Sequence, residues 1–214
     1  LTPGLPNADA EALQDPLYAN ALDLHQYLRI SEIMYNPTQD PDLEFVELIN
    51  IGPATLDLEG ARFTQGIEFT FPSLLLAAGE RVVLARDLGK FYAHYGSGAN
   101  VAGQYADNLS DGGEELALSL PEPFVTNILQ FEYDDDWYPS TDGGGYALVV
   151  ADAAQPPSRY GEKAGWQVGQ SIDGSPGTAD GVALSPTVVI NEVLTHTDYP
   201  APGAQPDAIE LHNT

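Results

Sequence analysis

The sequence has no cysteine, and only seven of its 214 residues are lysine or arginine. Without cysteine there is no disulfide framework, no thiolate metal site and no cysteine nucleophile. No apolar run approaches the roughly 18 residues that a membrane-spanning helix needs, so membrane insertion is not expected. Hydrophobic residues nevertheless make up 43% of the chain, which is enough for a folded core and argues against global disorder.

Acidic residues dominate the charge of the chain. The 32 aspartates and glutamates outnumber the basic residues so far that the formal net charge is −25. Such a surface repels phosphate groups, so nucleic acid is not expected as a partner. It favours divalent cations, cationic partners or a salty exterior. It also keeps a protein soluble without any ligand, which is the simpler interpretation.

A stretch near the start of the chain recurs near its end. The first copy reads Leu-Arg-Ile-Ser-Glu-Ile-Met, then a polar loop, then Glu-Phe-Val-Glu-Leu-Ile-Asn. The second reads Val-Val-Ile-Asn-Glu-Val-Leu, a polar loop, then Asp-Ala-Ile-Glu-Leu-His-Asn. The copies are about 160 residues apart, which is too far for a solenoid repeat and typical of tandem domains.

This repeat predicts one complete module and the truncated start of a second. The proline-punctuated N-terminal stretch is interpreted as a leader. The predicted segments are a leader or linker at residues 1–27, a module at 28–181, a linker at 182–187 and the opening hairpin of another module at 188–214.

Short strand-like runs fill the complete module, each bounded by glycine, proline, asparagine or aspartate. They lie at residues 28–35, 44–51, 67–71, 81–86, 115–120, 128–133 and 146–150. Short strands at such spacing indicate an antiparallel sandwich or barrel. Residues 151–181 show little periodicity, and Trp166 is expected to pin this return segment onto the sandwich.

One short helix interrupts the strands. Asp87 is a plausible N-cap, apolar and aromatic side chains follow at i, i+3, i+4 and i+7 from Leu88 to Tyr95, and Gly96 ends the pattern. We expect this aromatic stripe to pack over the sheet; a ligand shelf is the alternative.

Together these segments resemble the bacterial form of the lamin tail domain. The motifs that carry the resemblance, in the family's order, are Ile30-Ser-Glu-Ile-Met-Tyr-Asn-Pro37, Glu44-Phe-Val-Glu-Leu-Ile-Asn50, Leu56-Asp-Leu-Glu-Gly60, Leu76-Ala-Ala-Gly-Glu80, Trp137-Tyr-Pro139, Asp142-Gly-Gly-Gly-Tyr-Ala-Leu148 and Gly174-Ser-Pro-Gly177. The resemblance implies an all-β, antiparallel immunoglobulin-like β-sandwich with one short helix. It further implies a non-catalytic module of a large exported or surface protein.

One carboxylate falls where strand alternation places apolar side chains. Glu32 is expected to share a face with Leu28, Ile30 and Met34, and Glu192 repeats the pattern. A carboxylate in such a place must be paired, hydrogen-bonded or metal-bound. The structural interpretation, which we favour, is that Glu32 accepts backbone N–H groups of a loop or pairs with Arg62 or Arg81. The catalytic interpretation is a general acid with Glu47 as its partner.

Two acidic loops are candidates for calcium, which takes six to eight oxygen ligands. Neither matches the spacing of an EF-hand. The predicted metal ligands are Asp40, Asp42 and Glu44 in one loop and Asp134, Asp135 and Asp136 in the other. Solvated acidic loops without a metal are the alternative, and no other cofactor is predicted.

The sequence thus predicts a non-catalytic structural or adhesion module that is extracellular or on the bacterial cell surface. Its expected partners are neighbouring domains of the same polypeptide and a glycan or surface protein. The alternative is a calcium-dependent or carbohydrate recognition module, in which Tyr133, Trp137 and Tyr138 form an exposed stacking platform. The four histidines show no ligand spacing, and no serine lies in a nucleophile elbow.

Overall fold

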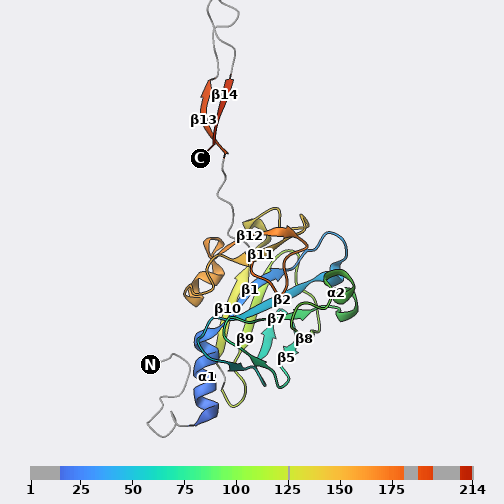
Figure 1. Ribbon diagram of the computed structural model, residues 1–214, viewed down its shortest axis with the longest axis vertical. Coiled ribbons are helices and arrows are strands. Elements are labelled where there is room, and N and C mark those ends of the chain that lie inside the picture. The colour runs from blue at the N-terminus through green and yellow to red at the C-terminus, as the bar shows by residue number, and fades with distance from the viewer. Residues whose placement is uncertain (1–14, 125, 181–187, 195–207, 214) are drawn as a thin grey trace, which may run out of the picture. The chain divides into compact units, whose positions relative to one another are not determined.

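The computed structural model describes residues 15–124, 126–180, 188–194 and 208–213. The chain divides between residues 181 and 182 into two compact units. The larger unit is a β-sandwich, with two α-helices among its described residues (Figure 1). The predicted linker at 182–187 and the hairpin loop of the second copy lie outside the described residues.

One layer of the sandwich is a six-stranded sheet in the order β12-β11-β1-β2-β7-β8. Its strands are β1 (Leu28–Met34), β2 (Phe45–Asn50), β7 (Arg81–Ala85), β8 (Val101–Gln104), β11 (Tyr146–Val150) and β12 (Trp166–Ile172). Its pairs are antiparallel except β7–β8, which is parallel. The parallel pair follows from its connection, because the chain crosses through helix α2 (Leu88–Tyr95) instead of a hairpin turn.

The other layer is a four-stranded sheet in the order β10-β9-β4-β5. Its strands are β4 (Arg62–Gln65), β5 (Phe69–Thr70), β9 (Glu114–Ser119) and β10 (Asn127–Tyr133). Other elements among the described residues of this unit are α1 (Pro16–Tyr27), the short pair β3 (Leu56–Asp57) and β6 (Leu75–Leu76), and the 3-10 turns η2 (Pro41–Leu43), η3 (Asp135–Trp137), η4 (Pro157–Gly161) and η5 (Lys163–Gly165). The all-β sandwich is therefore confirmed.

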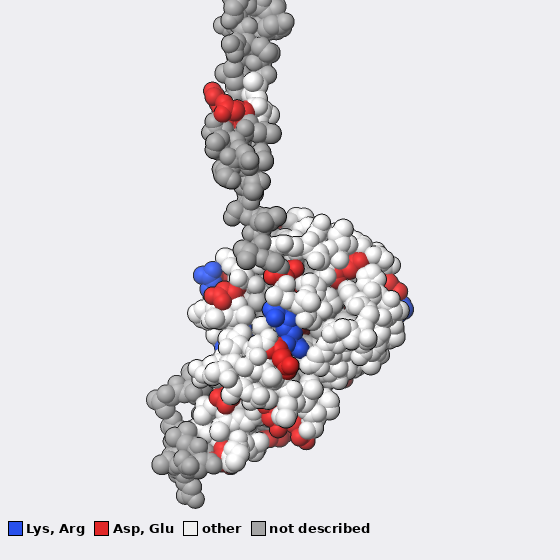
Figure 2. Space-filling model, viewed as in Figure 1, with Lys and Arg blue, Asp and Glu red and all other residues white. Residues whose placement is uncertain are grey.

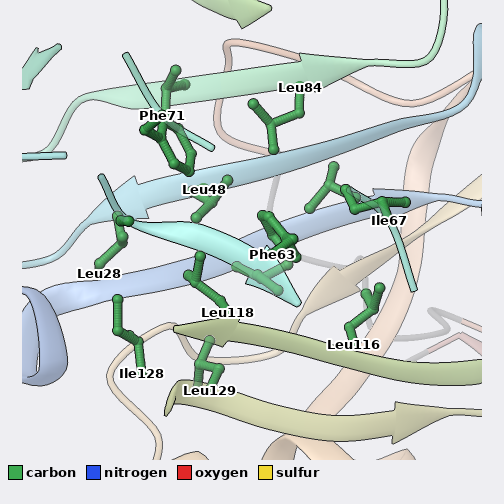
Figure 3. Close-up of a cluster of buried hydrophobic side chains, with 14 of the residues drawn as sticks. Leu28, Leu48, Phe63, Ile67, Phe71, Leu84, Leu116, Leu118, Ile128 and Leu129 are labelled. Atoms are coloured by element: carbon green, nitrogen blue, oxygen red, sulfur yellow. The ribbon is translucent and has the colours of Figure 1, made fainter. Parts of the chain in front are cut away.

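The core lies between the two sheets. In Figure 3, Leu28 and Leu48 of the six-stranded sheet face Phe63, Leu118 and Leu129 of the four-stranded sheet. All five side chains are at most 4% exposed. This apolar layer is the main source of stability for a module without disulfides.

A β-bulge at Ser31 decides which face each residue of β1 occupies. The register with β2 shifts between Ile30 and Glu32, so Ile33 rather than Glu32 joins Ile30 in the core. Glu32 instead lies on the outer face with Met34, which belongs to a second, smaller apolar cluster. The expectation that Glu32 shares a face with Leu28 and Ile30 is therefore wrong, because the extra residue reverses the alternation.

Helix α1 packs against the sandwich. Residues 16–27 are therefore part of the module and not a leader. Asp15 caps its first turn, and Tyr18, Ala21 and Leu24 on one face join the core. The Asn20 side chain exchanges hydrogen bonds with the backbone of Asp57 in β3, at 2.9 and 3.1 Å. The sequence analysis missed this helix because its apolar residues are spread around the helix and do not form a single stripe.

Helix α2 forms where predicted. Asp87 accepts the Lys90 N–H at 2.8 Å, and Gly96 ends the helix with φ of +76°. Its Phe91 and Tyr95 pack edge-on against Phe45 of β2. The aromatic stripe thus covers the outer face of the six-stranded sheet, which agrees with the packing interpretation.

The return segment contains one strand that the sequence analysis did not predict, β12. Trp166 at its start is 2% exposed, and its Nε1 donates to the Tyr160 carbonyl at 2.7 Å. Its ring also contacts Phe131 of the opposite sheet. Trp166 therefore pins this segment to the sandwich as expected.

The second unit is a hairpin of β13 (Val188–Leu194) and β14 (Ala208–Asn213). Its pairing reproduces that of β1 and β2, and the register shifts at the corresponding point, between Ile190 and Glu192. The internal repeat is thus a repeat of backbone structure as well as of sequence.

Deletion of residues 182–214 is expected to leave the melting temperature of the larger unit nearly unchanged. The reason is that the core of the sandwich is complete within the larger unit. Differential scanning calorimetry of the full chain and the shortened chain measures the effect. A drop beyond about 8 °C, roughly 2 kcal/mol or more at this size, would show that the hairpin stabilises the first module.

Candidate functional site

The most unusual polar site is a pair of buried glutamates on the outer face of the six-stranded sheet. Glu32 of β1 and Glu47 of β2 are direct cross-strand partners. They are only 2% and 1% exposed. Two carboxyl groups at such depth need donors and a counter-charge, because an unpaired buried carboxylate is costly.

A loop that follows β12 supplies donors to both carboxyl groups. The Ser175 N–H donates to Glu32 at 2.9 Å, and the Gly177 N–H donates to Glu47 at 2.6 Å. The Ser175 hydroxyl lies 3.3 Å from Glu32. Gly174 adopts φ of +81°, and a Cβ there would lie 2.7 Å from a Glu32 oxygen. Glycine at this position lets the loop approach the pair.

The strands beneath the loop provide the remaining contacts of Glu47. The Ser31 hydroxyl, on the same outer face, donates to Glu47 at 2.6 Å. Arg81 of β7 places its Nε 2.9 Å from Glu47, an ion pair that lacks hydrogen-bond geometry. One arginine therefore faces two carboxyl groups.

Burial and, second to it, the neighbouring Glu47 together raise the pKa of Glu32 to about 8, although the hydrogen bond from the Ser175 N–H opposes the shift. Burial also raises the pKa of Glu47, to about 6, against the hydrogen bonds from Ser31 and Gly177 and the charge of Arg81. A carboxylic acid with such a pKa suits proton transfer in principle. Here the overlying loop leaves both groups almost no contact with solvent.

These contacts agree with the structural interpretation of Glu32. It accepts a loop N–H as predicted, but it pairs with neither candidate arginine. Arg81 pairs with Glu47, and Arg62 pairs with Glu122 at 2.7 Å. The predicted pairing of Glu32 is wrong because the bulge and the register place Glu47, not Glu32, next to Arg81.

The carboxylates of the first acidic loop are paired with two basic side chains. Lys90 of α2 binds both Asp40 and Asp42, and Arg86 binds both Asp42 and Glu44. The Lys90 ammonium group lowers the pKa of Asp40. Glu44 is 2% exposed and also accepts the Leu109 N–H at 2.8 Å and the Tyr105 hydroxyl at 3.2 Å. The loop therefore ties α2 to the sandwich.

The second acidic loop forms the turn η3. Asp134 accepts the Asp136 N–H at 2.8 Å, and Asp135 and Asp136 occupy the first turn. Among the described residues, no group of three or more His, Cys, Asp or Glu side chains has an arrangement that fits a metal ion. Calcium at either loop stays a prediction.

The calcium hypothesis predicts a difference between two cations at equal ionic strength. For a dissociation constant near 10⁻⁴ M, about 10 mM calcium adds about 2.7 kcal/mol to the free energy of unfolding. Magnesium adds much less because it demands tighter octahedral geometry. The measurement is a pair of melting curves, repeated on Asp40→Asn and Asp134→Asn to locate the loop. Coincident curves for the two cations would remove the hypothesis.

The predicted aromatic platform is not exposed. Tyr133 is fully buried and donates to the Ser110 carbonyl at 2.7 Å. Trp137 and Tyr138 are partly buried against the core, and the Tyr138 hydroxyl donates to the Trp166 carbonyl at 2.9 Å. The platform hypothesis is wrong at Tyr133 because that residue lies on the core face of β10.

Figure 2 shows acidic side chains at several separate places on the visible face, with basic side chains among them. An open groove lies between η2 and α2, lined by Gln39, Asp40, Leu43, Lys90, Ala93 and His94. It does not include the glutamate pair. Among the described residues, no helix is long and apolar enough to cross a membrane.

Comparison with known proteins identifies the fold family. The search of curated proteins and the search of solved structures returned no match. The sequence model of the family described as "Lamin Tail Domain" matches residues 25–133. This match starts within α1 and spans both sheets up to the end of β10. The chain belongs to the lamin tail domain family.

Proposed function

We propose that the chain is a non-catalytic structural or adhesion module of a larger exported or cell-surface bacterial protein. Membership of a family of non-enzymatic immunoglobulin-like domains supports this role. Its proposed partners are neighbouring domains of the same polypeptide and a glycan or surface protein. Nucleic acid and membrane insertion are not among them, in keeping with the net charge of −25.

The main support for a non-catalytic role is the burial of the glutamate pair. The groups best suited to proton transfer, Glu32 and Glu47, are covered by the loop at Gly174 to Gly177. An enzyme needs such groups in a cleft that a substrate can enter. Here the pair instead fastens the loop to the central strands.

Surface location is testable by protease treatment of intact bacteria that produce the protein. We expect the treatment to release peptides from residues 15–180 while a cytosolic control protein stays intact. Release only after lysis would contradict the proposed location. A recognition role is the alternative: calcium dependence is tested by the cation comparison above, and carbohydrate stacking would rest on Trp137 and Tyr138, which are partly exposed, without Tyr133.

A further inference from the structure

The loop at residues 173–177 is held from two directions, by the glutamate pair beneath it and by helix α2. Asp173 is 4% exposed, and its Oδ2 accepts the Gln39 Nε2 at 2.7 Å and lies 3.2 Å from the His94 Nε2. The Tyr95 hydroxyl donates to the Asp173 carbonyl at 2.7 Å. The other carboxylate oxygen, Oδ1, is buried and has no hydrogen-bond partner among the described residues. His94 is thus the basic group that balances the charge of Asp173.

At the other end of this loop, several carboxyl groups share one arginine. Glu32 and Glu47 are cross-strand partners, and Arg81 pairs with Glu47. The Asp180 carboxylate accepts the Ser175 hydroxyl at 3.1 Å and adds a third acidic group near Glu32. Both ends of the loop are therefore held through carboxyl groups, with little positive charge to balance them.

Protons strengthen the hold at both ends. The His94 imidazole forms an ion pair with Asp173 only when it is protonated, which acidic pH favours. Closing the loop buries Glu32 beside Glu47, and burial favours the neutral acid over the carboxylate. Tyr95 stays protonated because burial and the charges of Asp173 and Glu32 raise its pKa. Closure thus takes up protons, so by linkage it becomes less favourable as the pH rises.

We propose that residues 173–177 form a strap that closes at acidic pH and opens as a local unit as the pH rises, while the rest of the sandwich stays folded. None of these five residues belongs to either apolar cluster, so opening breaks hydrogen bonds and leaves the core intact. A Cβ at Gly174 would lie 2.8 Å from the Phe45 ring. Opening therefore exposes Phe45 together with the glutamate pair. This inference is independent of the proposed location and adhesion role.

Amide hydrogen exchange of the full chain, followed by NMR between pH 5 and 8, tests the strap. The protection factor compares the measured rate with the intrinsic rate and so removes the direct effect of pH on exchange. We expect the amides of Ser175 and Gly177 to be about tenfold or more less protected than those of β9, a central strand. Their protection is expected to fall about tenfold per pH unit, as the release of one proton requires. Protection equal to that of β9, or independent of pH, would overturn the proposal.

His94→Gln tests the end of the strap that contacts α2. Glutamine keeps a neutral donor but cannot carry a proton, so the variant is expected to lower the protection of Ser175 and Gly177 about threefold at pH 5. At pH 8, where the imidazole is already neutral, it is expected to change nothing. His25→Gln makes the same substitution in α1 and serves as the control. Equal protection at pH 5 in His94→Gln and the original protein would contradict a strap held by His94.

Discussion

Raising the pH from 4.5 to about 8 is expected to lower the free energy of unfolding by on the order of 4 kcal/mol through Glu32. The pKa of Glu32 is raised on folding, so the folded state holds a proton that the unfolded chain releases. Its contribution to stability is therefore fully present below pH 4.5 and is lost as the pH rises through about 8. Glu47 adds a smaller loss in the same direction, up to about pH 6.

The charged and titratable groups around Glu32 explain why its pKa is raised on folding, which is unusual for a carboxyl group. Most carboxyl groups in folded proteins gain partners and stabilise the fold at neutral pH. Glu32 faces Glu47 and Asp180 and, among the described residues, accepts hydrogen bonds from Ser175, while Arg81 pairs with Glu47. At alkaline pH, Glu32 therefore becomes negatively charged next to Glu47, beneath the loop at 174–177, which contains no basic side chain.

Glu32→Gln isolates this effect. The neutral amide keeps an acceptor oxygen for the Ser175 N–H, so we expect the variant to match the original protein near pH 5 and exceed its stability at pH 8. Chemical denaturation at several pH values and fixed ionic strength measures the difference. Glu59→Gln removes the same charge from an exposed turn and serves as the control. Parallel pH profiles for Glu32→Gln and the original protein would show that Glu32 does not titrate abnormally.

Leu24→Ala is expected to destabilise the sandwich by about 3 kcal/mol, the cost of removing a buried leucine from a core. Leu24 is fully buried in the same cluster as the inter-sheet residues, although it lies in the predicted leader. At this size the loss corresponds to a melting temperature lower by about 6–12 °C. Thermal unfolding followed by the near-ultraviolet circular dichroism of the aromatic side chains measures it.

Leu17→Ala is the matched control for this variant. Leu17 lies in the same helix and is 45% exposed, so the same substitution changes helix propensity equally and removes little buried area. We expect it to cost under about 1 kcal/mol. Equal effects of the two substitutions would contradict a packed α1 and restore the interpretation of this segment as a leader.

The sequence pattern was sufficient to predict an element and its bounds where residues close in the sequence decide the structure. The apolar strand from Tyr146 to Val150 and the capped helix from Leu88 to Tyr95 were predicted with the bounds that the structure has. Turn residues and caps act on their immediate neighbours, so the sequence carries these signals directly.

The rest depended on contacts between distant residues. The bulge at Ser31 has no sequence signature of its own, yet it turns Glu32 away from the core. Arg81 was one of two arginines considered, and only the register between β2 and β7 assigns it to Glu47. Ser175 and Gly177 were visible as part of a closing motif, but their role as donors requires the loop to return to β1 and β2.

The covering of the glutamate pair by a loop late in the sequence also limits the order in which parts of the module can fold. The loop residues that seal it are separated from Glu32 and Glu47 by 143 and 130 positions in the chain. The neighbours of β1 are likewise divided, since β2 follows at once whereas β11 comes more than a hundred residues later. Contacts of such long range form slowly, because loop-closure entropy is lost before they contribute. During synthesis, Glu32 and Glu47 of the first hairpin therefore stay exposed to solvent until the loop at 174–177, near the end of the module, has left the ribosome.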